Sequence, residues 1–194
     1  MAAKTAIIAG VLLLSGCSMK SSEIRTYSLN PDLNFSKLSH SPYKEKSIKI
    51  GYPMNIKGKA SSSIYFSYSK IEEGSYQNAI WSSSNSQLLI AGIIRALEKG
   101  GVFKTVIDYN SLANTDYLLE TEVYDFYHKV RKNLSVSVVS IRFDMIDTDN
   151  NRLVKSRKFS YEIPTGTVDA LGYVKATNRA LEKLAVDLVR WLGR

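Results

Sequence analysis

Cysteine is almost absent from this chain of 194 residues, and its scarcity excludes several kinds of protein. Cys17 is the only cysteine, so no disulfide can form within one chain and the hydrophobic core alone must hold the fold. Histidine is nearly as scarce, with His40 in a polar stretch and His128 near the end of a β-rich stretch. Neither has a metal-ligand spacing to another His or Cys, whereas zinc sites usually use three or four such ligands. We therefore expect no metal site, and a surface or strand-end position for each histidine.

Sequence motifs of enzyme catalysis are also missing. The chain contains no G-x-S-x-G nucleophile elbow, no Walker A loop and no G-x-G-x-x-G run. Glu120 and Glu122 share one face of a predicted strand, which suits paired catalytic carboxylates but fits an ordinary exposed strand face equally well. The sequence predicts no catalytic residues, no cofactor-binding residues and no enzyme.

A short acidic stretch has the opening pattern of a calcium-binding loop. Asp147, Asp149 and Asn151 match the first ligands of an EF-hand. The sixth position, however, is Arg152 instead of Gly, and the twelfth is Lys158 instead of Glu. The stretch therefore predicts a hairpin turn.

Long hydrophobic runs are lacking as well. The longest, Ala6 to Leu14, follows Lys4 and would rise about 13 Å as a helix, far less than the roughly 30 Å of a bilayer core. The run ends in Leu14-Ser15-Gly16-Cys17, which resembles the bacterial lipobox, whose cysteine is acylated before cleavage. The alternative is an ordinary signal peptide that happens to contain a cysteine, although such signals end in a site of the A-x-A kind.

The lipobox interpretation predicts how the N-terminus is organised. Residues 1–16 would be a lipoprotein signal peptide, and residues 17–23 a lipidated N-terminus with a short tether. Cys17 would be the lipid attachment site, carrying a diacylglycerol and an N-acyl chain, and two or more chains anchor a protein stably. Ser18 in place of Asp favours the outer membrane, facing the periplasm, over the inner membrane. Seven residues separate Cys17 from Ile24 and extend at most about 25 Å, so the domain must work close to its membrane.

Acidic residues are outnumbered by basic ones. There are 26 Lys and Arg against 18 Asp and Glu, a formal net charge of +8, and +7 once Lys4 leaves with the signal peptide. Such an excess could favour anionic lipid headgroups or an acidic protein partner, but a solvated surface without a partner explains it equally well. Nucleic acid is not expected as a partner, because no concentrated basic stripe occurs.

Periodicity in the remaining residues predicts a single domain over residues 24–194, of α+β class, with a mixed sheet and two main helices packed on it. The helices are predicted at 84–99, from the Ser84–Gln87 capping box to Gly100-Gly101, and at 168–192. Strands are predicted at 24–29, 47–52, 64–68, 76–81, 102–107, 116–130, 134–146 and 152–163, with a loop at 30–46. A parity switch in the apolar residues of 134–146 indicates either a bulge or burial on both faces.

Aromatic residues gather in the two strands at 64–68 and 76–81. They are Tyr65, Phe66, Tyr68, Tyr76 and Trp81. A buried sheet explains them more readily than an aromatic ligand cage, because strand cores favour such residues.

Several short motifs follow the lipobox in a specific order. They are Tyr27-Ser28-Leu29, Trp81 before a Ser-capped helix, Leu97-Glu98-Lys99-Gly100-Gly101-Val102-Phe103, Asp116-Tyr117-Leu118-Leu119-Glu120 with Phe126, Ala176-x-x-x-Ala180-Leu181, and Asp187-Leu188-Val189-Arg190-Trp191-Leu192. In this order of motifs the chain resembles the ABC-type transport auxiliary lipoproteins. The resemblance implies an α/β fold with a mixed sheet and no catalytic residues. It also implies partners, namely a periplasmic MCE-domain protein with an inner-membrane ABC permease and an ATPase, which together move phospholipid or other lipids between membranes. A homo-oligomer is conceivable beside a ring-forming MCE partner.

Two functions stay open at this point. One is a non-catalytic auxiliary component of an MCE-type lipid transport system. The other is a lipid- or glycan-binding envelope lipoprotein that acts alone, with its aromatic strands forming the pocket.

Overall fold

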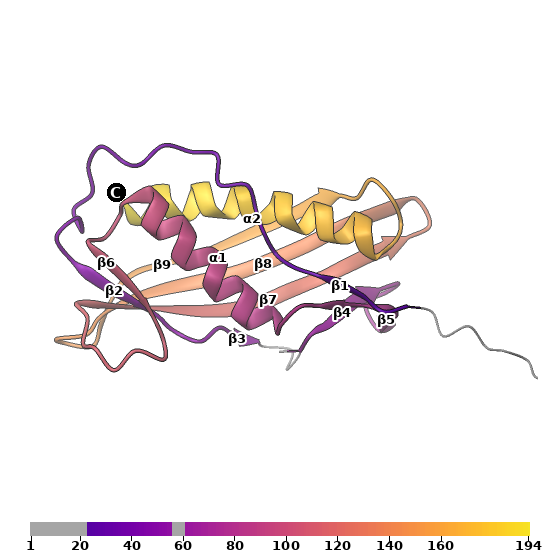
Figure 1. The fold of residues 1–194 in the computed structure, drawn as a ribbon, viewed down its shortest axis with the longest axis horizontal. Coiled ribbons are helices and arrows are strands. Elements are labelled where there is room, and N and C mark those ends of the chain that lie inside the picture. Colours follow the sequence, from indigo (N-terminus) through magenta and orange to yellow (C-terminus); the bar gives the residue numbers. More distant parts are fainter. Residues whose placement is uncertain (1–22, 56–60) are drawn as a thin grey trace, which may run out of the picture.

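The protein, described by a computed structural model over residues 23–55 and 61–194, is one domain of mixed strands and helices (Figure 1). In chain order its elements are β1 (Arg25–Tyr27), β2 (Ser47–Ile50), β3 (Met54–Asn55), β4 (Ser63–Ser67), β5 (Glu73–Trp81), α1 (Asn85–Gly100), β6 (Thr105–Asp108), β7 (Tyr117–Arg131), β8 (Leu134–Asp147), β9 (Arg152–Pro164) and α2 (Ala170–Leu192). The predicted α+β class with two helices is confirmed. The predicted signal peptide and Cys17 lie outside the described residues, so they stay predictions.

The strand β7 organises the sheet. On one side it begins the antiparallel meander β7–β8–β9. Its other edge is shared by three short strands, all parallel to it: β2 pairs with its start, β3 with its middle and β4 with its end. The sheet continues from β2 to β6, and from β4 to β5 and β1. One long strand therefore unites two smaller groups of strands that are far apart in sequence.

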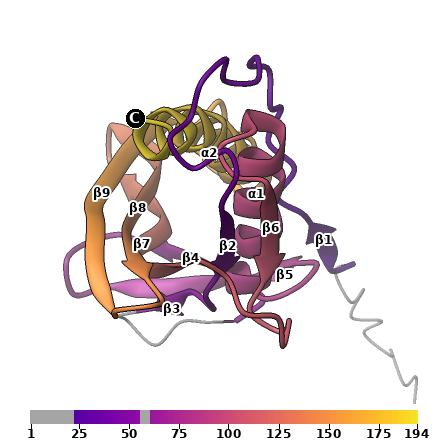
Figure 2. The same ribbon diagram turned by 90° about the vertical axis from the view of Figure 1, so that its left-hand side faces the viewer.

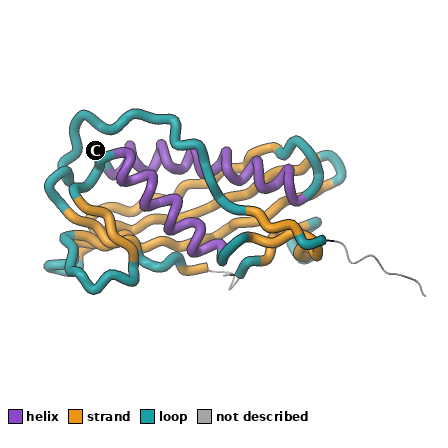
Figure 3. The backbone as a smooth tube through the Cα atoms, in the orientation of Figure 1, coloured by secondary structure: helices purple, strands orange, loops and turns teal. Residues whose placement is uncertain are grey.

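Both helices pack on the same face of the sheet (Figure 3). Viewed along the long axis, the sheet curves around them (Figure 2). Their apolar faces join the inward side chains of the central strands in one hydrophobic cluster that includes Ile48, Leu119 and Phe143, all without exposed surface. Burial of this kind supplies most of the stability of a domain without disulfides.

The helix α1 begins and ends where its local signals predict. The Ser84 hydroxyl accepts a hydrogen bond from the backbone N–H of Gln87, which satisfies one free donor of the first turn. Gly101 takes the left-handed conformation, with φ of 60°, and its N–H donates to the carbonyls of Leu97 and Glu98. Gly92, inside the helix, makes no close backbone approach to a neighbouring element, since a Cβ there would meet nothing within 4 Å.

The helix α2 starts two residues later than predicted. Its N-cap is Asp169, whose carboxylate accepts a hydrogen bond of 2.7 Å from the N–H of Gly172. This bond lowers the pKa of Asp169. Leu171 in its first turn is exposed, while Tyr173, two residues later, is fully buried.

The strand predictions are right in position but miss one element, and the parity switch at 134–146 reflects burial on both faces, which is one of its two predicted interpretations. The two-residue strand β3 has no signal of its own and exists through its pairing with β7. The strand β8 is buried on both faces, with Val136 and Val139 at most 3% exposed, whereas a bulge lies in β7 between Val123 and Asp125. On the outer face an ion pair of 2.9 Å joins Lys129 of β7 to Glu162 of β9 across β8.

Candidate functional site

The described chain starts at one end of the molecule. Glu23 and Ile24 lead into β1, which pairs in parallel with β5, and Figure 1 places this start at the same end of the molecule as the β7–β8 turn and the beginning of α2. The predicted lipid attachment site, Cys17, is six residues before Glu23 and lies outside the described residues. A tether of this length keeps this end of the domain within about 25 Å of any lipid on Cys17.

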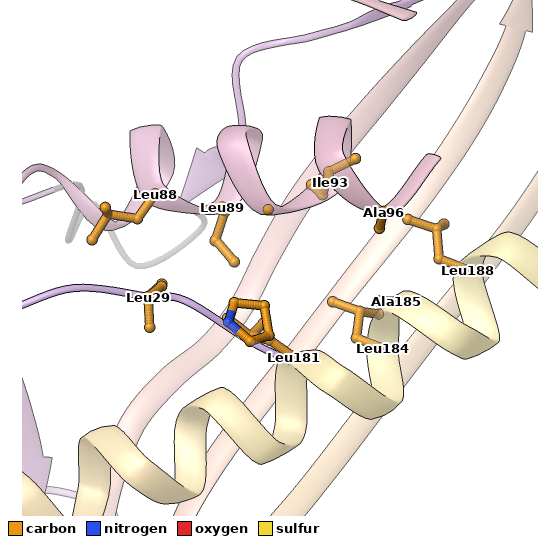
Figure 4. A pocket seen from close by; sticks show the side chains of 11 residues that line it. Leu29, Leu88, Leu89, Ile93, Ala96, Leu181, Leu184, Ala185 and Leu188 are labelled. Atoms are coloured by element: carbon orange, nitrogen blue, oxygen red, sulfur yellow. The ribbon is translucent and has the colours of Figure 1, made fainter. Parts of the chain in front are cut away.

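A small apolar pocket lies between the two helices. It is lined by Leu29, Pro31, Leu88, Leu89, Gly92, Ile93, Ala96, Leu181, Leu184, Ala185 and Leu188, and Figure 4 shows the helix side chains pointing toward one another. The free space inside is about 20 Å³, enough for roughly one water molecule. An acyl chain does not fit into this space.

The segment over this pocket is fastened to both helices. The N–H of Asn30 donates to the Asn178 side chain of α2 at 2.7 Å, and Arg95 of α1 donates to the Asn30 side chain at 3.0 Å. The N–H of Asp32 donates to Glu182 of α2 at 3.1 Å. These bonds hold the segment, which lines the pocket through Leu29 and Pro31, against both helices.

His128 is a fully buried titratable group whose pKa lies below its ordinary value because of burial. It lies near the end of β7, as one of the two predicted positions requires, but it has no exposed surface, so the predicted surface position is wrong. Its Nδ1 lies 2.8 Å from the Tyr76 hydroxyl and its Nε2 lies 2.8 Å from the Ser135 hydroxyl. The ring stacks on Tyr173 with centroids 5.3 Å apart. The spacing of residues along the strand could have predicted this burial. His128 follows Phe126 by two residues, so both side chains lie on the inward face of the sheet.

The hydrogen bonds of His128 fit a neutral ring. The Thr165 hydroxyl donates to the Ser135 carbonyl, so it accepts from the Ser135 hydroxyl at 2.6 Å. The Ser135 hydroxyl then accepts from Nε2–H, and Nδ1 accepts from Tyr76. Burial lowers the pKa of His128 to about 4, and the nearby Asp169 opposes this only in part. The ring of His128 itself has no exposed surface, so it serves the core.

The two carboxylates of β7 share one face of the strand, as their spacing in the sequence predicts. Glu120 and Glu122 lie on the outer face of β7, where Glu122 accepts a hydrogen bond of 3.1 Å from the Tyr124 hydroxyl. The register places Arg142 of β8 opposite Glu122, and Arg142 forms an ion pair of 3.0 Å with Asp144. This is an open strand face with neighbouring charges of both signs.

The remaining candidates lie in a loop and a turn. His40 is exposed in the loop before β2, and Asp147 to Asn151 form the predicted hairpin turn, with Asn151 at φ of 56°. In residues 23–55 and 61–194, no group of three or more His, Cys, Asp or Glu could hold a metal ion. Within the same residues, none of the helices combines the length and apolarity that a membrane span requires.

The strand aromatics divide between core and surface. Trp81 is 2% exposed and packs against Phe126 and Tyr173, with ring centroids about 6 Å apart. Phe66 lies between Tyr68 and Tyr76, and the Tyr68 ring is 48% exposed. The expectation of a buried sheet is right for Trp81 and wrong for Tyr68, and the rings pack on one another without forming a cage.

Solved structures share this fold. The protein XCC0632 from Xanthomonas campestris is similar over 87% of this chain and 95% of its own, with a TM-score of 0.76 and 20% sequence identity. An uncharacterised protein is similar over 88% of this chain and 99% of its own, with a TM-score of 0.64 and 15% identity. At these identities the likeness shows the fold alone. No curated protein matches the sequence.

One family model matches the sequence, and it covers more than half of the chain. The match extends over residues 68–189, from the end of β4 through most of α2. The model describes the ABC-type transport auxiliary lipoprotein component. This is the family that the sequence motifs resemble, and the chain belongs to it.

Proposed function

We propose that this protein is a lipid-anchored periplasmic lipoprotein that serves as a non-catalytic auxiliary component of an MCE-type ABC system for lipid transport. In this proposal a diacylglycerol and an N-acyl chain on Cys17 hold it in the outer membrane. The system moves phospholipid or related lipids between the inner and outer membranes. The partners are a periplasmic MCE-domain protein and, through it, an ABC permease and an ATPase.

The observation that carries the proposal is membership in the auxiliary lipoprotein family over residues 68–189. The lipobox at Leu14 to Cys17 supports it independently, because it lies outside the matched region. The site supports a non-catalytic role, since the carboxylates of β7 stand on an open face and His128 is enclosed by neutral partners. An auxiliary protein of this kind acts by position and contact.

The stand-alone carrier is less well supported by the geometry. A lipid carrier needs an apolar volume that matches its ligand, and ligand pockets are usually several hundred Å³ in size. The apolar pocket between α1 and α2 leaves about 20 Å³ free. A larger depression, near Asp32 and Asp187, is lined mostly by polar side chains, which do not suit an acyl chain.

Intact-mass spectrometry of the protein extracted from bacterial membranes tests the anchor. The mature chain should start at Cys17 and carry the mass of a diacylglycerol and an acyl chain. Cys17→Ala should lose this mass and leave the outer membrane, while Ser21→Ala should retain both. A mature chain with an unmodified Cys17 would contradict the proposed anchor.

Co-purification tests the partner. The tagged protein, extracted in mild detergent, should recover an MCE-domain subunit, and the same preparation from cells with Cys17→Ala should recover much less. Repeated absence of such a subunit under mild conditions counts against the transport role. Native mass spectrometry of the unlipidated domain separates the alternatives, because a stand-alone carrier should retain a bound lipid.

A further inference from the structure

Six exposed apolar side chains lie on segments at the end of the molecule where the described chain starts (Figure 1). They are Ile24 (58% exposed), Tyr68 (48%), Ile71 (97%), Leu134 (41%), Val168 (67%) and Leu171 (38%). They come from the start of the domain, the β4–β5 turn, the β7–β8 turn and the junction of β9 with α2, which all lie at the same end in Figure 1. We call this set the apolar end. Exposed apolar groups gathered in this way mark contact surfaces.

The topology brings these four segments together. The parallel strand β4 pairs with the last part of β7, with Ser67 opposite Lys129, so both strands finish at one level. The antiparallel strand β8 begins there, and β9 returns there with Pro164 opposite Val136. The β4–β5 turn, the β7–β8 turn and the segment from β9 to α2 therefore project from a single end of the sheet.

Hydrogen bonds hold the projecting segments in place. Arg131 donates to the Ser67 carbonyl at 2.6 Å, which ties the β7–β8 turn to the end of β4. The N–H of Thr165 donates to the Ser135 carbonyl at 3.0 Å, which ties the segment before α2 to β8. The apolar end is thus a preformed surface, and its apolar side chains are displayed without rearrangement.

Charges around the apolar end are of both signs. Lys70 and Lys132 are exposed beside the apolar tips, while Glu72 is also exposed. Asp169 is occupied as the cap of α2. An interface of apolar tips with flanking lysines suits the headgroup region of a bilayer, where apolar side chains enter the acyl boundary and ammonium groups meet phosphates.

We propose that the apolar end inserts shallowly into the bilayer that holds the lipid anchor, so that the domain stands on the membrane by this end. This inference rests on the proposed lipid anchor at Cys17. The argument for a bilayer is the length of chain between Cys17 and Ile24, which reaches at most about 25 Å and begins at this end. The opposite end also exposes apolar residues, including Leu112 at 100%, but β7 alone separates the two ends by about 46 Å.

The test uses the lipidated protein in vesicles with a fluorescent label at one new cysteine, since Cys17 is acylated in the mature chain. The labelled variants are Ile71→Cys and Val168→Cys, with Leu112→Cys at the opposite end as a matched control of equal or greater exposure. The vesicles contain phosphatidylethanolamine, phosphatidylglycerol and a phospholipid with a nitroxide on its acyl chain. Each label is also exposed to iodide, a quencher that stays in water.

At positions 71 and 168 we expect lipid-nitroxide quenching several times that at position 112, and iodide quenching several times weaker. Equal quenching at the three positions, or strong nitroxide quenching at 112, would overturn the inference. Flotation of the same vesicles separates this failure from failure of the anchor. A protein that does not float with the vesicles lacks the anchor. A protein that floats, but whose labels at positions 71 and 168 are not quenched by the lipid nitroxide, has the anchor but does not insert its apolar end.

Discussion

Protonation of His128 should destabilise the fold in mildly acidic solution. Burial places the folded-state pKa at about 4, against about 6.5 in the unfolded chain, so only the unfolded state binds the proton between these values. The stability that neutral His128 provides is therefore complete above pH 6.5 and is lost as the pH falls toward 4. Linkage over this window gives a loss of about 2 kcal/mol between pH 7.5 and 5.0, and about 3 kcal/mol below pH 4.

Urea unfolding of the chain without residues 1–17, at pH 7.5 and 5.0, measures this loss. His128→Gln can still donate and accept hydrogen bonds but is uncharged at both pH values. It should be less stable than wild type at pH 7.5, and it should lose much less free energy of unfolding between pH 7.5 and 5.0. His40→Gln, in an exposed loop, is the matched control and should retain the drop. The reasoning is refuted if wild type and His128→Gln lose the same free energy of unfolding, or if an NMR titration places the pKa of His128 near 6.5.

Three further substitutions test how the helices are built, each by urea unfolding at pH 7.5. Gly92→Ala should stabilise the protein by about 1 kcal/mol, because the new methyl group enters open space inside a helix; a destabilised variant would contradict this. Gly100→Ala should destabilise it by about 1–3 kcal/mol, because its Cβ would lie 2.6 Å from a methyl carbon of Val189, and an unchanged midpoint would show that Val189 can move away. Asp169→Ala should cost about 1 kcal/mol through the lost cap on the N–H of Gly172, whereas Asp169→Asn should retain most of it.

Local signals in the sequence account for the elements that were predicted well. Ser84 with Gln87 starts α1, and Gly101 ends it, since caps depend on residues within one turn of each other. The hairpin turn between β8 and β9 is likewise specified by short polar residues that accept backbone hydrogen bonds, as Asp147 does from the N–H of Asp149.

Features that depend on residues far apart in the sequence could not be predicted from local signals. The strand β3 is two residues long and is ordered by the open middle edge of β7. The burial of His128 requires Tyr76 from β5, Ser135 from β8 and Tyr173 from α2, which the chain brings together only in three dimensions. The apolar end is non-local in the same sense, because its four segments meet through sheet topology and not through sequence spacing.

The motifs that make the chain resemble its family are mostly buried. Trp81, Leu97, Phe103 and Leu119 are at most 6% exposed. Such residues specify packing, so they define the fold that the family shares and leave the partner undefined. Specificity for a partner must then come from exposed residues, whose pattern is free to vary on a constant core.

Orientation decides which exposed residues these are. If the apolar end stands in the bilayer, then β7 carries the opposite end about 46 Å away from it. That end presents Leu112 and Leu153, both more than half exposed, and it carries none of the proposed membrane contacts. A periplasmic partner approaching from outside the bilayer would meet this end and the outer face of β7 to β9 first. The anchor would thus fix the height of the docking surface above the membrane, which is a role that needs no catalytic residue.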